Sequence, residues 1–184
     1  RRPSARCTTV LPPMPPCIER VKSAKLLGVF ITDNLKFGDH VNYVLQRSCQ
    51  RLYLLKLLRC QGLPLHNLSI VCVALLISRL TYAISAWGGF CSASDVGRIN
   101  SFLKRVVKFG FLTKFINFNS YLDQADLKLF KRMCHSDHCL HMLLPALKPT
   151  VCQKLRRRTH VYTLPKYRYE LFKKSFVLRC LYNF

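Results

Sequence analysis

The side chains best suited to chemistry are crowded into one stretch, Cys134-His135-Ser136-Asp137-His138-Cys139-Leu140-His141. Cysteine thiolates and histidine imidazoles are the ligands that zinc prefers. Zinc ligands, however, usually arrive as pairs from separated loops, and the later candidates are Cys152 and His160. The crowding therefore favours a segment without a metal, with zinc as the alternative.

The same stretch contains His135-Ser136-Asp137, whose His-x-Asp spacing begins an iron facial triad. His160 would be the third ligand, and the short chain between leaves little room for a barrel. A cysteine nucleophile needs only one histidine beside it, and chance pairs are expected among ten Cys and six His. Two-metal catalysis needs carboxylates that hold ions about 3.5 to 4 Å apart, but none of the eight acidic residues forms an Asp-Asp pair. The sequence predicts neither a catalytic centre nor a bound cofactor.

The charge balance dominates the composition. Thirty Lys and Arg face eight Asp and Glu, which gives a formal net charge of +22. Such an excess repels itself in a compact state, and nucleic acid, with one negative charge per about 1.7 Å of duplex axis, is the simplest partner to relieve it. An anionic membrane surface is the competing partner, and purely solubilising basicity is the third interpretation. The Tyr and Phe residues interleaved with cations after residue 148 suit base stacking, with a place in the core as the alternative.

Ten cysteines are scattered from Cys7 to Cys180, mostly among apolar residues, as Cys72 is. Such cysteines behave as small buried hydrophobes in a reducing compartment. No apolar run follows Arg1 as a secretory signal would require. We therefore expect an intracellular protein, in the nucleus or cytoplasm, and the missing initial Met suggests a chain cut from a longer one.

Apolar periodicity predicts a mainly α fold with one short β element. A proline-rich lead-in over residues 1–17 precedes an apolar run over 25–32, which reads as a buried strand with Gly28 inside it. An amphipathic helix then begins with Asp39 as its N-cap and stops at Gly62-Leu63-Pro64. Its apolar stripe is Val41, Val44, Leu45, Ser48, Leu52 and Leu55, and Arg47 and Arg51 lie beside that stripe.

The most apolar stretch, residues 68–87, predicts a buried core helix. A membrane span of about 20 residues is the alternative. Arg79 argues against a span, since a central Arg costs about 2.5 to 3.5 kcal/mol on insertion scales. We therefore expect no membrane partner.

Ser94-Asp95 is expected to cap a helix over residues 96–112. Its apolar side is Ile99, Phe102, Leu103, Val106 and Val107, and its basic side is Arg98, Lys104, Arg105 and Lys108. No acidic residue occurs between Asp39 and Asp95, or between Asp95 and Asp123, so the positive field over these helices is nearly unopposed. Residues 121–147 predict one more helical segment together with the His- and Cys-rich patch.

Several short motifs follow one another in a recognisable order. They are Lys25-Leu26-Leu27-Gly28-Val29 after Glu19 to Ala24, Gln50-Arg51-Leu52-Tyr53-Leu54-Leu55, Tyr82 with Trp87-Gly88, Arg105, His138 and His141 with Leu143-Leu144-Pro145, Arg156-Arg157-Arg158-Thr159-His160, Leu164-Pro165, and Lys174-Ser175-Phe176-Val177. Together they resemble the region after the catalytic palm of non-LTR (LINE, jockey-like) reverse transcriptases. The resemblance covers about residues 10 to 184. The chain departs from the family at Val106, where an alanine is usual, and at Cys139, where a proline is usual.

The resemblance implies a palm-edge β element over residues 1–38, a thumb-like helical bundle over 39–115, and a loosely packed, basic and aromatic C-terminal region over 116–184. A thumb grips the backbone of the RNA and DNA primer–template, so the phosphate contacts expected here are Arg47, Arg51, Lys104, Arg105 and Lys108. Lys25 and Gly28 would lie near the primer end. The family's fingers and its Mg²⁺-binding Asp-Asp motif would lie upstream of Arg1, so the fragment alone is expected to be inactive. A stand-alone nucleic-acid-binding or interaction module is the alternative, and a membrane-associated protein is a further one.

Overall fold

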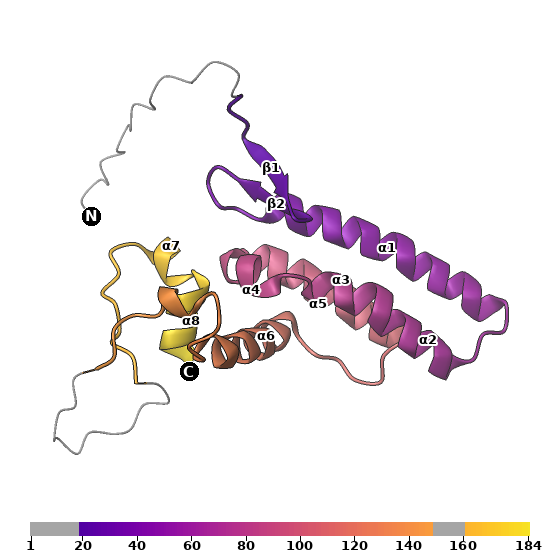
Figure 1. The fold of residues 1–184 in the computed structure, drawn as a ribbon. Helices are drawn as coiled ribbons and strands as arrows, with labels where there is room; N and C mark the ends of the chain where they lie inside the picture. Colours follow the sequence, from indigo (N-terminus) through magenta and orange to yellow (C-terminus); the bar gives the residue numbers. More distant parts are fainter. Residues whose placement is uncertain (1–18, 149–160) are drawn as a thin grey trace.

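The computed structural model describes residues 19–148 and 161–184. Within these ranges a β-hairpin precedes a long helix, α1, which lies beside the α2–α3 helix and α5, and α6 connects this group to α8 (Figure 1). The predicted mainly α fold with a short β element is confirmed. The proline-rich lead-in, Cys152, the Arg156–Arg158 run and His160 lie outside the described residues.

The β element is a hairpin and not the single buried strand that we predicted. Strands β1 (Ser23–Leu26) and β2 (Val29–Thr32) pair antiparallel, with Leu26 opposite Val29. Leu27 and Gly28 form the two-residue turn at φ values of 47° and 85°, the conformation that matches the right-handed twist of a hairpin. Gly28 therefore lies in the turn, where positive φ favours glycine, and β1 is exposed along its whole length.

Helix α1 (Gly38–Cys60) buries the predicted stripe, except that Leu45 is half-buried. Its N-cap is Phe37, so the prediction of Asp39 as the cap is wrong; the carboxylate lies in the first turn, where it favours the helix dipole. The predicted stop is confirmed. The backbone N–H of Gly62 (φ 89°) donates to Arg59 and that of Leu63 to Leu58, each at 3.1 Å, which is the Schellman pattern.

The apolar stretch forms α2 (Leu65–Cys72), a π-helical turn (Val73–Ile77), α3 (Ser78–Thr81), α4 (Ile84–Trp87) and a 3-10 turn (Gly88–Phe90). Ala83, at φ 50°, breaks the helix. The predicted burial holds for one side only, since Ile70, Val73 and Leu75 are exposed. By length and composition Leu65–Phe90 could cross a membrane, and 33% of its most apolar window is buried. The absence of a membrane partner therefore stays a prediction.

Helix α5 (Ala93–Lys108) begins earlier than predicted, because Ser92 and not Ser94 is its N-cap. The Ser92 hydroxyl accepts from the Asp95 N–H at 3.1 Å and donates to the Asp95 carboxylate at 2.6 Å. Helix α6 (Phe118–Met133) follows, capped by Asn117. Beyond Met133 the His- and Cys-rich patch forms turns, including a 3-10 turn at His141–Leu143.

Two groups of buried side chains hold these elements together. The larger surrounds the fully buried Trp87 and continues from α1 to Phe118 and Leu122 on α6. The smaller joins Phe130 and Tyr162 to α8 (Phe176–Asn183), which follows the short α7 (Glu170–Lys173).

A buried ion pair links the C-terminal helix to the rest. Arg179 on α8 donates to the Asp126 carboxylate on α6 at 2.6 and 3.1 Å. The same guanidinium donates to the carbonyls of Ser85 at 2.9 Å and Lys174 at 2.6 Å. One side chain therefore ties α8 to α6 and to α4.

Candidate nucleic-acid interface

The predicted binding residues separate onto two sides of α1. On one side the hairpin turn and α3 enclose the hairpin-side pocket, with a volume of about 450 Å³, lined by Leu27, Gly28, His40, Tyr43, Val44, Arg51, Ser78, Arg79 and Tyr82. On the other side α1 and α5 enclose the α1–α5 groove, with a volume of about 720 Å³, lined by Asn42, Leu45, Gln46, Cys49, Ser94, Gly97, Arg98, Ser101, Phe102 and Arg105. We therefore describe two surfaces.

Three cations gather around Tyr43 at the edge of the hairpin-side pocket. Lys25 Nζ lies 4.9 Å from the centroid of the Tyr43 ring, and the Cζ atoms of Arg47 and Arg79 lie at 5.8 and 5.6 Å. Arg79 also donates to the Tyr43 hydroxyl at 3.0 Å. Partial burial raises the pKa of Tyr43, but the charges of Lys25 and Arg79 and hydrogen bonds from Arg47 and Lys25 outweigh it and lower the pKa below its ordinary value. The lowered pKa reflects a locally positive field.

Arg51 reaches the same pocket from α1. Its Nη1 donates to the carbonyl of Leu75 in the π-helical turn at 2.8 Å. A guanidinium carries five N–H donors, so this bond orients the group and leaves donors for an anion. Four cations, Lys25, Arg47, Arg51 and Arg79, thus lie around one pocket with Gly28 in its wall.

His40 forms the floor of this pocket as a neutral group. Burial, and then the Arg79 charge, lower its pKa. Its Nδ1 accepts from the Phe30 N–H at 3.4 Å, and its ring meets Trp87 edge-on. The imidazole therefore adds no positive charge near neutral pH and acts as a structural contact between the hairpin and the core.

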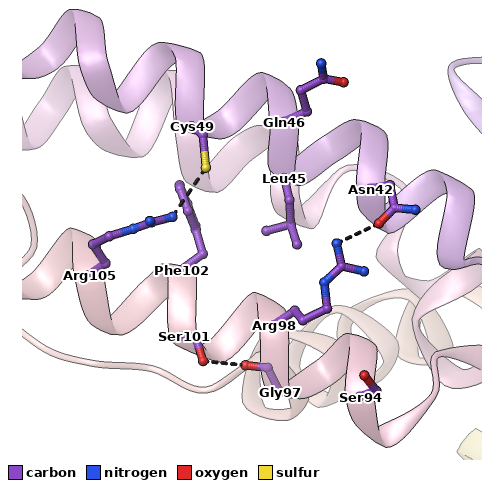
Figure 2. A pocket seen from close by; sticks show the side chains of 10 residues that line it. All are labelled: Asn42, Leu45, Gln46, Cys49, Ser94, Gly97, Arg98, Ser101, Phe102 and Arg105. Atoms are coloured by element: carbon purple, nitrogen blue, oxygen red, sulfur yellow. Dashed lines mark hydrogen bonds between the residues drawn. The ribbon is translucent and has the colours of Figure 1, made fainter.

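The walls of the α1–α5 groove carry Arg98 and Arg105 among polar and apolar side chains (Figure 2). Arg98 Nη2 donates to the Asn42 side-chain oxygen at 2.6 Å, and Arg105 Nη2 donates to Cys49 Sγ at 3.3 Å. Both guanidinium groups thereby bridge α5 to α1. Of the three α5 cations that we predicted, only Arg105 lines the groove.

Lys104 and Lys108 lie one turn apart on α5, and both are exposed. Lys104 Nζ lies 5.7 Å from the ring centroid of Phe115, beyond the end of α5. Neither lysine lines the groove or the hairpin-side pocket. They extend the positive surface of α5 without joining either enclosed site.

The sequence analysis did not assign Arg79 or Arg98 to binding. In the structure Arg79 lines the hairpin-side pocket and Arg98 lines the α1–α5 groove. Arg79 was visible as the one cation inside an apolar stretch, a position that requires a polar partner when buried. Its partner, Tyr43, comes from a distant part of the chain, so the pairing needs the tertiary fold.

Little acidic charge opposes these cations. In the part of the chain that the structure describes, the salt bridges are Arg98–Asp95 at 3.5 Å and Arg179–Asp126 at 2.6 Å. Lys25, Arg47, Arg51 and Arg79 take part in neither. Their charges are therefore free to attract a polyanion.

Two histidines of the His- and Cys-rich stretch make hydrogen-bond contacts with backbone groups of the surrounding turns. His138 Nδ1 accepts from the Leu140 N–H at 3.2 Å, and His141 Nδ1 lies 3.1 Å from the Met133 carbonyl. Among residues 19–148 and 161–184, no three His, Cys, Asp or Glu side chains lie close enough together to hold a metal ion.

Comparisons of this chain with protein-family models, with curated proteins and with solved structures find no match.

Proposed function

We propose that the chain is the nucleic-acid-gripping part of an RNA-directed DNA polymerase of the non-LTR retrotransposon kind, without a catalytic centre of its own. The observation that carries this proposal is the gathering of Lys25, Arg47 and Arg79 around Tyr43, with Arg51 in the same pocket. The order of motifs in the sequence supports the polymerase family. Mg²⁺ would be held by the upstream part of the parent enzyme.

The two surfaces suit contact with a phosphate backbone. Arg and Lys neutralise phosphates and release counterions, and such contacts position a duplex without reading its sequence. The α1–α5 groove presents Arg98 and Arg105 beside neutral hydrogen-bonding groups. We propose that α1 lies along the primer–template, with the hairpin turn near the primer end.

Salt dependence of binding tests the proposal. The full chain should bind an RNA–DNA hybrid duplex in a fluorescence anisotropy assay, with an affinity that falls steeply between 50 and 200 mM salt. Each neutralised phosphate contributes about 0.9 to the slope of log K against log salt. Lys25→Ala with Arg47→Ala should therefore lower the magnitude of the slope by about two.

The matched control removes two exposed cations from α6, in Lys128→Ala with Arg132→Ala. It makes the same change in net charge, and we expect the slope to stay unchanged. Equal slopes for the two double variants, or no binding even at 50 mM salt, would contradict the assignment.

A stand-alone nucleic-acid-binding module shares the charge argument but needs a self-sufficient fold. Failure of the isolated chain to melt cooperatively as a monomer would exclude that alternative. Aggregation rescued by an added upstream palm segment would favour the polymerase fragment.

A further inference from the structure

The hairpin-side pocket differs in kind from the α1–α5 groove because it presents an aromatic ring. Tyr82, between α3 and α4, lines the pocket and is 53% exposed. The aromatic residue that lines the groove is Phe102, which is 2% exposed and belongs to the core. The groove therefore suits only the phosphate backbone of a nucleic acid, whereas the pocket also offers an exposed ring on which a base can stack.

Tyr82 is held in place by one hydrogen bond at its ring hydroxyl and one at its backbone carbonyl. Its hydroxyl donates to the Leu27 carbonyl in the hairpin turn at 3.1 Å. Its own carbonyl accepts from the indole N–H of the fully buried Trp87 at 3.0 Å. A ring fixed in this way loses little freedom when a ligand stacks on it.

Two strained residues position this ring. Leu27 and Ala83 both have positive φ, at 47° and 50°, a conformation that residues with a side chain adopt at a cost. Leu27 accepts the Tyr82 hydroxyl bond, and Ala83 directly follows Tyr82. Strain that the surrounding structure maintains is concentrated at ligand sites.

The pocket that presents Tyr82 also has cations that suit a phosphate. Arg79 and Arg51 line the pocket together with Tyr82. Arg79 donates to the Tyr43 hydroxyl and Arg51 to the Leu75 carbonyl, and each guanidinium keeps further N–H donors. The volume of about 450 Å³ lies within the range of small-ligand sites, roughly 300 to 1,000 Å³.

We propose that this pocket holds one unpaired nucleotide, with its base stacked on Tyr82 and its phosphate bound by Arg79 and Arg51. A base inside a duplex has both faces covered by its neighbours and a terminal pair exposes one face at a fixed position, whereas an unpaired base can swing out to place its face on a protein ring. The inference rests on the proposed nucleic-acid function. It adds a preference for duplexes that carry an unpaired end over blunt duplexes.

The test compares two fluorescein-labelled hybrid duplexes of equal length, one blunt and one with a short single-stranded overhang. Stacking of one base on an aromatic side chain corresponds to roughly a five- to 150-fold change in Kd. We expect the full chain to bind the overhang duplex at least about five-fold more tightly. Tyr82→Leu should abolish this preference and leave the blunt-duplex Kd within about two-fold.

Two further variants separate stacking from folding. Tyr53→Leu removes a tyrosine that is 62% exposed on α1, outside the pocket, and should keep the preference. Tyr82→Phe keeps the ring and loses the bond to Leu27, so it should keep most of the preference. If Tyr82→Phe is as defective as Tyr82→Leu, or if Tyr82→Leu weakens both duplexes equally, the stacking proposal is wrong.

Competition with a free mononucleotide shows whether the pocket binds the unpaired end of a duplex or a free nucleotide. AMP at millimolar concentration should reduce binding of the overhang duplex to the level of the blunt one. AMP binding without any overhang preference would overturn the proposal in favour of a free-nucleotide site. Tight, salt-sensitive and equal binding of both duplexes would refute the pocket alone, whereas no binding to either would refute the proposed function as well.

Discussion

Replacing Arg179 by methionine should remove much of the stability of the fold. The side chains of Arg179 and Asp126 are only 11% and 1% exposed, so Arg179→Met leaves a carboxylate buried without its cation. Breaking a buried ion pair from one side costs about 3 to 5 kcal/mol. The carbonyls of Ser85 and Lys174 lose a charged donor in the same step, which places the expected loss toward the upper end.

Urea unfolding followed by circular dichroism measures this loss. With a slope of about 2 kcal/mol per molar urea, the midpoint should fall by about 1.5 to 2.5 M. The control, Arg132→Met, removes an exposed arginine from α6 and should change stability by less than about 0.5 kcal/mol.

The double variant Asp126→Leu with Arg179→Met completes a double-mutant cycle. Removing both charges should recover part of the loss, because no unpaired charge remains in the interior. A loss below about 1 kcal/mol for Arg179→Met, or a double variant that is less stable by the full sum of the two single losses, would refute this account of how α8 is anchored.

Four further outcomes are expected. In Gly89→Ala, the added Cβ would lie 1.8 Å from the guanidinium of the buried pair, so thermal melting should show a loss comparable to that of Arg179→Met. Ser92→Ala removes the α5 cap and should cost about 0.5 to 2 kcal/mol in the same assay. Burial and then the Arg79 charge lower the pKa of His40 below its ordinary value of 6.5. The unfolded chain therefore binds more protons than the folded chain as the pH falls, and the free energy of unfolding should decrease from pH 7 to pH 5. His40→Gln should make the free energy of unfolding less dependent on pH in this range. Burial raises the pKa of Cys91 to about 12, so peptide mapping after iodoacetamide treatment at pH 8 should find this thiol unmodified when the exposed ones have reacted. The exposed thiols include Cys49, Cys60 and Cys139.

The amphipathic helices were the most predictable part of the fold. The buried stripes of α1 and α5 match the sequence because each helix buries one side at the 3.6-residue period. The hairpin was hidden, since Leu27-Gly28 continues an apolar run and lacks the polar residues that usually mark a turn. The α5 cap could have been assigned correctly, because Ser92 stands three residues before Asp95, which is the capping-box spacing.

The candidate site was predictable only in part. The sequence indicated Lys25, Arg47 and Arg51 individually, but it could not place Lys25 and Arg47 around one ring or Arg51 in the adjoining pocket. Tyr43 meets Lys25 through the hairpin and Arg79 through α3, and these contacts depend on how three separate elements pack. A single cation within an apolar helix, as Arg79 is, is the one feature of the local sequence that would have indicated a cation cluster.

The π-helical turn at Val73–Ile77 sets the rotational phase of everything after it. The turn takes up one residue more than an α-helix needs for the same rotation, so deleting one residue there would restore α-helical geometry and keep Arg79 facing Tyr43. One residue inserted in the α-helical part before Arg79 would instead advance the chain by about 100° around the axis and turn Arg79 away from Tyr43. The cation would leave the pocket although no residue of the pocket had changed. An insertion in the α-helical part before Arg79, outside these five residues, is therefore a sharper marker of lost binding than most substitutions in the helix.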